Sequence, residues 1–159
     1  MSTALQVSVR LAGESDLDFL ADAHRLAHAA ITDARGGTLD TAAHGRREPI
    51  ADTFAPQLDS ESFAVLIGEL DATAVGYAVL ERSVLPDTTV IGSIESIWVH
   101  PEARGVGIGA ALLSEVTSIA KNWQCASLDS RALPGDRVTK NFFESFGLVA
   151  RSIQVNRPL

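Results

Sequence analysis

The sequence contains a single cysteine, Cys125, among its 159 residues. One cysteine cannot form an intramolecular disulfide and cannot supply the ligands of a cysteine-based metal cluster. Histidine is also scarce. Of the four histidines only His24 and His28 stand at a helical spacing, and a bare pair without the HExxH pattern is more typical of surface decoration than of a metal site. The sequence therefore predicts neither a disulfide framework nor a metal.

Basic residues are few, and long apolar runs are missing. There are 13 Lys and Arg against 20 Asp and Glu, which gives a formal net charge of −7. A domain this acidic is a poor binder of the phosphate backbone of nucleic acids. No stretch reaches the length of a membrane-spanning helix, and the N-terminus lacks the apolar core of a signal peptide. We therefore expect no nucleic-acid partner, no membrane partner and a cytoplasmic location.

The remaining composition is that of an ordinary globular chain. Hydrophobic residues make up 46% and charged residues 21%, which are typical values. A length of 159 residues predicts a single domain over residues 1–159 with a real core. No internal repeat, linker or low-complexity tract interrupts it.

The spacing of apolar residues predicts alternating strands and helices. Residues 32–62 are predicted to be an irregular insert with a short helix near 49–57. Three β-branched runs then form an antiparallel meander. The strands are predicted at 5–12, 62–70, 74–84, 88–99, 126–129 and 148–155, and the other helices at 16–30, 107–122 and 134–147.

The predicted order is thus β-α-α-β-β-β-α-β-α-β, an α+β (mixed α/β) fold. The helix at 107–122 joins the strand that ends at Val99 to the strand at 126–129. Such a connection implies one parallel crossover within a mostly antiparallel sheet.

Three glycines lie at the start of that helix in the stretch HPEARGVGIGAALL, namely Gly105, Gly107 and Gly109. A helix N-terminus leaves its first N–H groups unpaired and carries a partial positive charge, which suits phosphate. Glycines remove the Cβ atoms from the approach and allow successive amides to point inward. Arg104 adds a cation, so the stretch is predicted to bind a pyrophosphate.

Two kinds of phosphate loop fit this stretch poorly. A P-loop ends in GK[ST], where this chain has GIGA. The dinucleotide fingerprint GxGxxA is matched by Gly105, Gly107 and Ala110, with Asp129 near the position of a ribose-binding acid. However, its glycines should follow their strand directly, whereas His100–Arg104 intervene here. The chain is also too short and too antiparallel for a doubly wound sheet.

The stretch instead resembles the acetyl-CoA-binding motif of the GNAT superfamily of N-acetyltransferases, Q/R-x-x-G-x-G/A, preceded by a strand ending in Val-x-Pro. Arg104, Gly107 and Gly109 fill the motif, and IWVHP supplies the strand end. The resemblance implies a sheet whose parallel pair splays at the cofactor site, with helices on both faces. It also implies that acetyl-CoA is the cosubstrate. The implied cofactor-binding residues are Ile97, Trp98, Val99, Arg104, Gly105, Val106, Gly107, Ile108, Gly109, Ala110 and Phe143.

The resemblance also implies the chemistry, which is direct attack of a primary amine of a small molecule or peptide on the thioester. Family members often place a base on the strand before the motif. By period two, Glu95 shares a face with Ser93, Ile97 and Val99, so Glu95 is the candidate base. The alternative is a strand glutamate paired with an arginine.

One position departs from the family. A tyrosine often donates a proton to the thiolate from the last helix, but FFESFG places Phe143 there, and phenylalanine has no proton to donate. Phe143 therefore leaves open a second function, a non-catalytic acyl-CoA-binding module. A third function, a nucleotide-dependent oxidoreductase, is suggested by GxGxxA and also stays open.

The acceptor is not identified by the sequence. Cations that could bind an acidic group of the acceptor are Arg35, His44, Arg46 and Arg47. A homodimer is common in the family, and the resemblance leaves that open.

Overall fold

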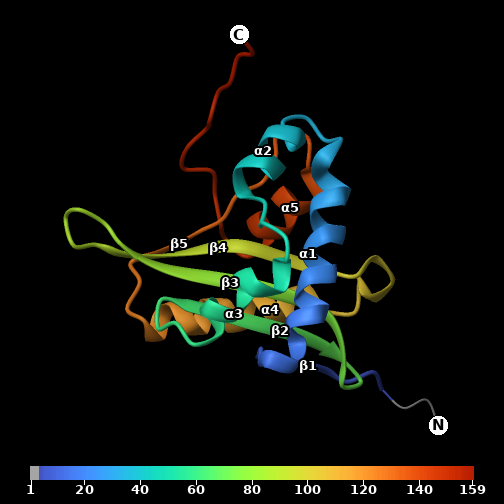
Figure 1. Cartoon of the computed structure of the whole chain (residues 1–159). Helices are drawn as coiled ribbons and strands as arrows, with labels where there is room; N and C mark the ends of the chain where they lie inside the picture. The colour runs from blue at the N-terminus through green and yellow to red at the C-terminus, as the bar shows by residue number, and fades with distance from the viewer. Residues whose placement is uncertain (1–3) are drawn as a thin grey trace.

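The computed structural model of the chain describes residues 4–159, which fold around one five-stranded sheet (Figure 1). The strands lie side by side in sequence order; the first four pair antiparallel, and the last two pair parallel. Their bounds are β1 Val7–Leu11, β2 Phe63–Leu70, β3 Thr73–Val84, β4 Val90–Val99 and β5 Ser127–Asp129. The predicted α+β fold, mostly antiparallel with one parallel pair, is confirmed.

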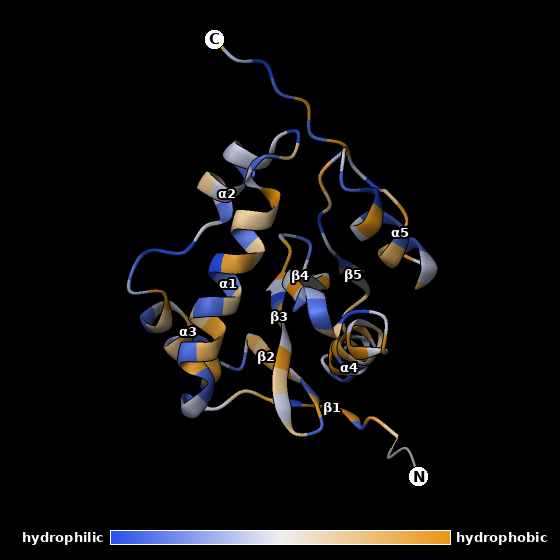
Figure 2. Ribbon diagram, turned by 90° about the vertical axis from the view of Figure 1, so that its right-hand side faces the viewer, coloured by the Kyte–Doolittle hydropathy of each residue, from blue (hydrophilic) through white to orange (hydrophobic). Residues whose placement is uncertain are grey.

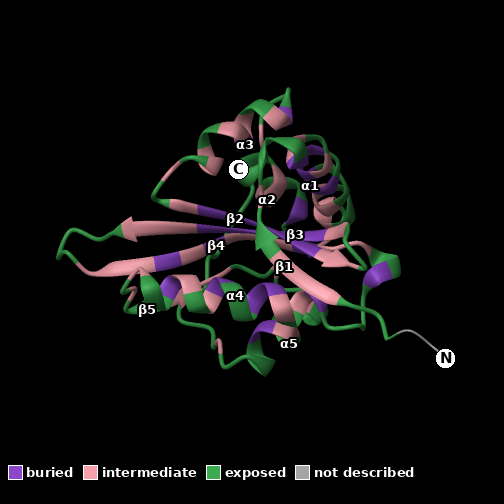
Figure 3. Ribbon diagram, turned by 90° about the horizontal axis from the view of Figure 1, so that it is seen from below, coloured by how far each residue is buried: buried purple, intermediate pink, exposed green. Residues whose placement is uncertain are grey.

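Helices cover both faces of this sheet, as predicted. Figures 2 and 3 show α1, α2 and α3 on one side and α4 and α5 on the other. The helices are α1 Leu17–Thr32, α2 Gly37–His44, α3 Ile50–Leu58, α4 Ile108–Asn122 and α5 Arg137–Ser145, with 3-10 turns at Glu14–Asp16 and Pro101–Ala103. Within residues 4–159 no helix combines the length and the apolar character needed to cross a membrane.

The central strand β3 separates two hydrophobic cores. Its side chains alternate between the faces, so Tyr77 and Val79 pack with α1 and α3, whereas Ala78 and Leu80 pack with α4. All four are 0% exposed. A strand covered on both faces is apolar throughout, which explains the continuous run in its sequence. The two cores hold β3 in place, and the neighbouring strand β4 lies between it and β5.

Helix α2 was not predicted, because residues 37–44 were expected to belong to an irregular loop. Its first residue, Gly37, is buried against the end of α1. A Cβ built there would lie 1.8 Å from the carbonyl oxygen of Ile31, so only glycine permits this approach. The helix therefore depends on a contact with α1 that local propensity does not reveal.

The strand predicted at 148–155 is not formed. Residues 148–159 contain no strand, and the end of this segment extends away from the body of the molecule (Figure 1). Val149 is 81%, Ile153 84% and Val155 88% exposed. The alternation typical of a strand is present, but β5 is three residues long and its outer edge offers few backbone groups for pairing.

The histidine pair on α1 also differs from the expected surface decoration. His24 is 3% exposed, and its ring lies 4.0 Å from that of His28, centroid to centroid. Burial lowers the pKa of His24 to about 4. This side chain is therefore a neutral part of the core at pH 7.

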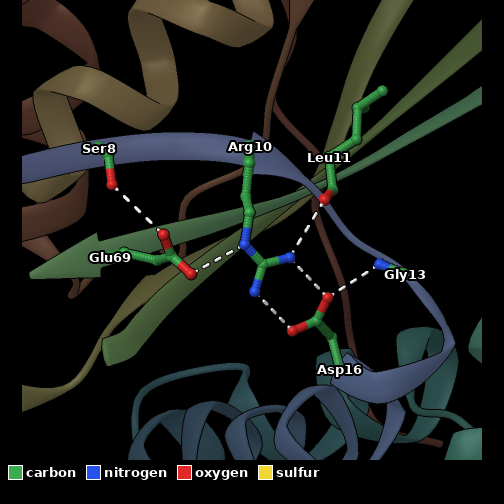
Figure 4. Close-up of polar contacts among 6 residues, drawn as sticks. All are labelled: Ser8, Arg10, Leu11, Gly13, Asp16 and Glu69. Atoms are coloured by element: carbon green, nitrogen blue, oxygen red, sulfur yellow. Dashed lines mark hydrogen bonds and ion pairs between the residues drawn. The ribbon is translucent and has the colours of Figure 1, made fainter. Parts of the chain in front are cut away.

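An ion-pair cluster ties the first strand to the first helix (Figure 4). Asp16 is buried and accepts hydrogen bonds from both terminal nitrogens of Arg10, at 2.7 and 2.8 Å, and from the main-chain N–H of Gly13 at 2.8 Å. Arg10 also donates from Nε to Glu69 on β2 at 2.8 Å. The hydrogen bonds from Arg10 hold the pKa of Asp16 below its usual range.

We expect Asp16→Asn to lower the free energy of unfolding at pH 7 by about 1–3 kcal/mol, because a hydrogen-bonded buried carboxylate loses its charge. A lowered pKa stabilises the fold above the unfolded value of about 3.9 and ceases to do so as the pH falls through the folded value. The difference between variant and parent should therefore shrink in acid. Urea denaturation at pH 7 and pH 3 measures it. The exposed neighbour Asp18, mutated to Asn, is the control; an equal loss in both variants contradicts the prediction.

Candidate functional site

The loop before α4 has the backbone that the glycine pattern predicts. Gly105 has φ +83° and Gly107 has φ +97°, a region that side-chain-bearing residues rarely adopt. A Cβ built at either glycine meets no atom within 4 Å. The loop therefore surrounds open space, and the glycines are needed there for their backbone conformation rather than for packing against the protein.

Main-chain donors converge on this loop. In the part of the chain that the structure describes, the N–H groups of residues 105–110 have no acceptor, and the first helical hydrogen bond runs from Ala111 to Gly107. The side chain of Arg104 is exposed and donates to the carbonyl oxygen of Val99 at 3.0 Å. Unpaired N–H groups at a helix N-terminus beside a guanidinium fit a diphosphate. We call residues 104–110 the cradle.

Apolar side chains of the core and of α5 hold the cradle in position. Ile108 is 1% exposed and is anchored in the core shared with α4, whereas Val106 is 40% exposed. A Cβ at Gly109 would lie 3.3 Å from the ring of Phe142, so α5 supports the loop through Phe142. The neighbouring Phe143 is 6% exposed and belongs to the same core. Sequence reasoning singled out Phe143 and missed Phe142.

The end of β4 presents an unpaired edge. The N–H of His100 donates to Val75 on β3 at 2.8 Å. Because hydrogen bonding alternates along an antiparallel pair, the N–H and C=O groups of Ile97 and Val99 point to the opposite edge, where the C=O of Val99 already accepts the hydrogen bond from Arg104. The parallel partner β5 reaches only Ile91–Ser93. The backbone around Trp98 therefore faces a gap that can accept another extended chain.

A β-bulge at Glu95 changes which side chains share a face. Val79 pairs with Ser96 and Leu80 pairs with Ile94, so Glu95 has no partner on β3. An extra residue of this kind reverses the alternation beyond it. Ile97 and Val99 pack on the α4 side, while Glu95 lines a cleft on the other side. The prediction that Glu95 shares a face with Ile97 and Val99 is therefore wrong.

That cleft has a volume of about 500 Å³ and three walls. We call it the acidic cleft. Strands β3 and β4 form the first wall, the segment around α2 and α3 the second, and the loop after β5 the third. The lining residues are Glu81, Ser93, Glu95 and Ser96 from the strands, Ala43, His44, Gly45, Arg46 and Gln57 from the helical segment, and Arg131 from the loop.

Arg46 crosses the cleft and contacts Glu95. Its Nη2 lies 3.3 Å from Oε2 of Glu95 and 2.8 Å from Oε1 of Gln57, and its Nη1 lies 3.2 Å from the carbonyl oxygen of Thr53. Its guanidinium carbon stands 3.7 Å from the centre of the Phe54 ring. Only 12% of its side chain is exposed. The arginine partner considered for Glu95 is therefore present, but the carboxylate still borders open space.

A second carboxylate lies in the same wall. Burial raises the pKa of Glu81, and the charge of Glu95 and a hydrogen bond to it raise that pKa further. Sequence reasoning missed Glu81 and Arg131, because only the folded chain brings β3, β4 and the loop after β5 together. It did find His44 and Arg46. Arg35 and Arg47 do not line the cleft.

Asp129, considered above as a ribose-binding acid, is engaged otherwise. Its Oδ1 accepts a hydrogen bond from Nε of Arg151 at 2.8 Å, and a second nitrogen of that arginine contacts its Oδ2. These contacts hold the pKa of Asp129 below its usual range. The carboxylate thus binds the C-terminal segment.

Comparison with known proteins gives a consistent set of similarities. The model of the acetyltransferase (GNAT) family matches residues 24–148. An uncharacterized N-acetyltransferase of Archaeoglobus fulgidus is 27% identical over 116 residues, which cover 72% of this chain and 74% of the relative.

Solved structures share the fold at low sequence identity. An aminoglycoside N-acetyltransferase in complex with CoA is 15% identical, with a TM-score of 0.79 over 100% of this chain and 98% of the other. A ribosomal-protein-alanine N-acetyltransferase from Brucella melitensis biovar Abortus 2308 is 17% identical, with a TM-score of 0.71 over 97% and 99%.

Proposed function

The chain belongs to the acetyltransferase (GNAT) family, and from this premise we propose that it transfers an acetyl group from acetyl-CoA to a primary amine of a small molecule or peptide. One observation supports the proposal above all. Strand β4 carries an unpaired edge that leads to the cradle, and on its other side it carries a carboxylate that borders the acidic cleft. A donor and an acceptor can therefore meet at the same strand.

The cradle is proposed to hold the diphosphate of acetyl-CoA. Arg104 and the N–H groups of Gly105, Val106, Gly107, Ile108, Gly109 and Ala110 supply its donors. The open edge at Ile97, Trp98 and Val99 is proposed to pair with the pantetheine arm as an additional strand would. Phe143 contributes apolar packing under the cradle. When bound there, acetyl-CoA supplies the acetyl group as a thioester.

Glu95 is proposed as the base of the transfer. The amine nitrogen bonds to the acetyl carbonyl carbon as the bond from that carbon to sulfur breaks, and a proton passes from nitrogen to Glu95. The N–H of Val99 points to the open edge and can stabilise the negative charge on the carbonyl oxygen. Arg46 orients Glu95 from the cleft side.

The departing thiolate is proposed to take its proton from solvent. Phe143 has none to donate. The only tyrosine, Tyr77, is buried in the core beneath α1 and α3, and burial raises its pKa to about 12.

A melting experiment tests cofactor choice first. We expect acetyl-CoA at 100 times its Kd to stabilise the fold by about 2.7 kcal/mol, since a ligand that binds only the folded state shifts the unfolding equilibrium. NAD at the same concentration should leave the melting temperature unchanged. Stabilisation by NAD alone would instead favour the oxidoreductase alternative.

A second experiment separates an enzyme from a binding module. The protein is incubated with acetyl-CoA and a panel of amines, amino acids and peptides, and free CoA thiol is measured. Release that depends on the acceptor supports the proposed transfer. Tight binding of acetyl-CoA without release for any acceptor supports the non-catalytic alternative.

A further inference from the structure

The acidic cleft holds charges of both signs. Within the described residues, two of the charged groups, Glu81 and Arg131, lack a close partner of opposite charge. Arg46 is committed, because its nitrogens already contact Glu95, Gln57 and Thr53. Glu81 has no cationic partner within 4.0 Å anywhere in residues 4–159. The cleft therefore contains two carboxylates but only one bound guanidinium.

The cation without a close partner lies on the third wall of the cleft. Arg131, in the loop after β5, has 51% of its side chain exposed. Its only ion-pair contact in the described part of the chain is from Nε to Asp40 at 4.0 Å, the outer limit for such a pair. His44 also contacts Asp40, at 3.8 Å. The planar nitrogens of Arg131 are thus free to bind a carboxylate in two-point fashion.

We infer that the acceptor is a zwitterion, a small molecule that carries a primary amine and a carboxylate, with its amine held by Glu81 and Glu95 and its carboxylate held by Arg131. This assignment rests on the proposed function and names its substrate class. The ammonium group would neutralise the paired carboxylates, and the carboxylate would neutralise Arg131. A volume of about 500 Å³ suits a molecule of the size of an amino acid or dipeptide.

The assignment also says which amines the cleft rejects. A polycationic acceptor would bring positive charge to both Arg46 and Arg131. An amine without an anionic group would leave Arg131 unmatched. Neither kind of amine supplies a cation for the two carboxylates together with an anion for Arg131. Both should therefore bind more weakly than a zwitterion.

Matched acceptors test the inference. A panel of α-amino acids and dipeptides is assayed, each beside its carboxamide, and O-phosphoethanolamine is assayed beside ethanolamine. We expect kcat/KM for the best acid to exceed that for its amide by about 10- to 100-fold, the value of a charged hydrogen-bonded contact. Arg131→Gln should bring this ratio close to one, and Arg131→Lys should restore part of it. Arg157→Gln, an exposed change on the C-terminal segment, should keep the parent ratio.

Calorimetric binding of the same acids and amides, measured without turnover, keeps this test apart from that of the proposed function. Transfer to amines with equal kcat/KM for acid and amide would overturn the inference and leave the acetyltransferase proposal standing. A preference for O-phosphoethanolamine over every carboxylate would overturn the carboxylate assignment. Binding of acids that is selective and lost in Arg131→Gln supports the inference even if no acetyl transfer is found, and absence of any binding overturns it.

Discussion

Glu95→Gln is expected to lower kcat by about 10²- to 10⁴-fold, the usual contribution of a positioned general base. Glutamine has nearly the same shape as glutamate but cannot take a proton from the amine. Arg46 keeps its contacts with Gln57 and Thr53 in this variant, so the wall of the cleft should stay in place. The Kd of acetyl-CoA should change little, because Glu95 lies on the cleft side of the bulge. Steady-state release of CoA thiol and calorimetric binding of acetyl-CoA measure the two effects.

Two further variants sharpen this experiment. Glu115→Gln changes an exposed glutamate on α4 and should leave kcat at the parent value. Glu81→Gln tests the second carboxylate of the acidic cleft. If Glu81→Gln abolishes turnover while Glu95→Gln is fully active, the base has been assigned to the wrong member of the pair. If both retain full turnover, no carboxylate of the cleft takes the proton.

Features fixed by short-range rules could be predicted from the sequence. Asp136 is the N-cap of the last helix, a position at which aspartate is preferred, and its carboxylate accepts a hydrogen bond from the N–H of Thr139 at 3.1 Å. Gly147 lies just past the end of that helix, where glycine is the residue that most readily adopts a left-handed conformation, and it has φ +85°. The backbone conformation of the cradle is also fixed by short-range rules, because it depends on the glycine spacing and on the amphipathic helix that follows directly. These positions need no knowledge of distant partners.

Features that depend on pairing between distant segments could not be predicted in this way. The bulge at Glu95 exists only relative to β3, and a period-two pattern read along β4 alone places this side chain on the wrong face. Glu81 and Arg131 are 50 positions apart in the sequence and line the same cleft only because β5 runs parallel to β4. The C-terminal segment shows the opposite case, since its alternation predicts a strand for which the sheet offers no adequate edge.

The consequence for function is that the two halves of the site differ in how well a sequence reveals them. The cofactor side depends on backbone conformation, which glycine spacing encodes directly. The acceptor side is assembled from three walls in which no residue type is unusual for its element. This explains why the family motif indicates acetyl-CoA, whereas the acceptor class that we infer is argued only from the folded arrangement of Glu81, Glu95 and Arg131.

Gly107→Ala is expected to raise the Kd of acetyl-CoA by about 10- to 100-fold, corresponding to the loss of one or two charged hydrogen bonds from the cradle. The φ of +97° at this position disfavours alanine by about 1–3 kcal/mol. The loop can relax only by turning its N–H groups away from the diphosphate. A methyl group that kept the parent backbone would project into the open space of the cradle, where no protein atom lies within 4 Å.

Substitutions at two other glycines distinguish the effect of backbone strain from the loss of acetyl-CoA binding. Gly147 has φ +85° and an equally open Cβ position, but it follows α5 outside the cradle. Gly147→Ala should therefore lower the stability of the fold about as much as Gly107→Ala does, while the Kd of acetyl-CoA stays at the parent value. Gly135 also has open space around its Cβ position and no positive φ, so Gly135→Ala should change neither the stability of the fold nor the Kd of acetyl-CoA. Melting temperature and calorimetric Kd for the three variants distinguish strain from loss of binding. If Gly107→Ala binds acetyl-CoA as tightly as Gly147→Ala, the amides of residues 105–110 do not hold the diphosphate, because a bound diphosphate would be sensitive to the conformation at Gly107.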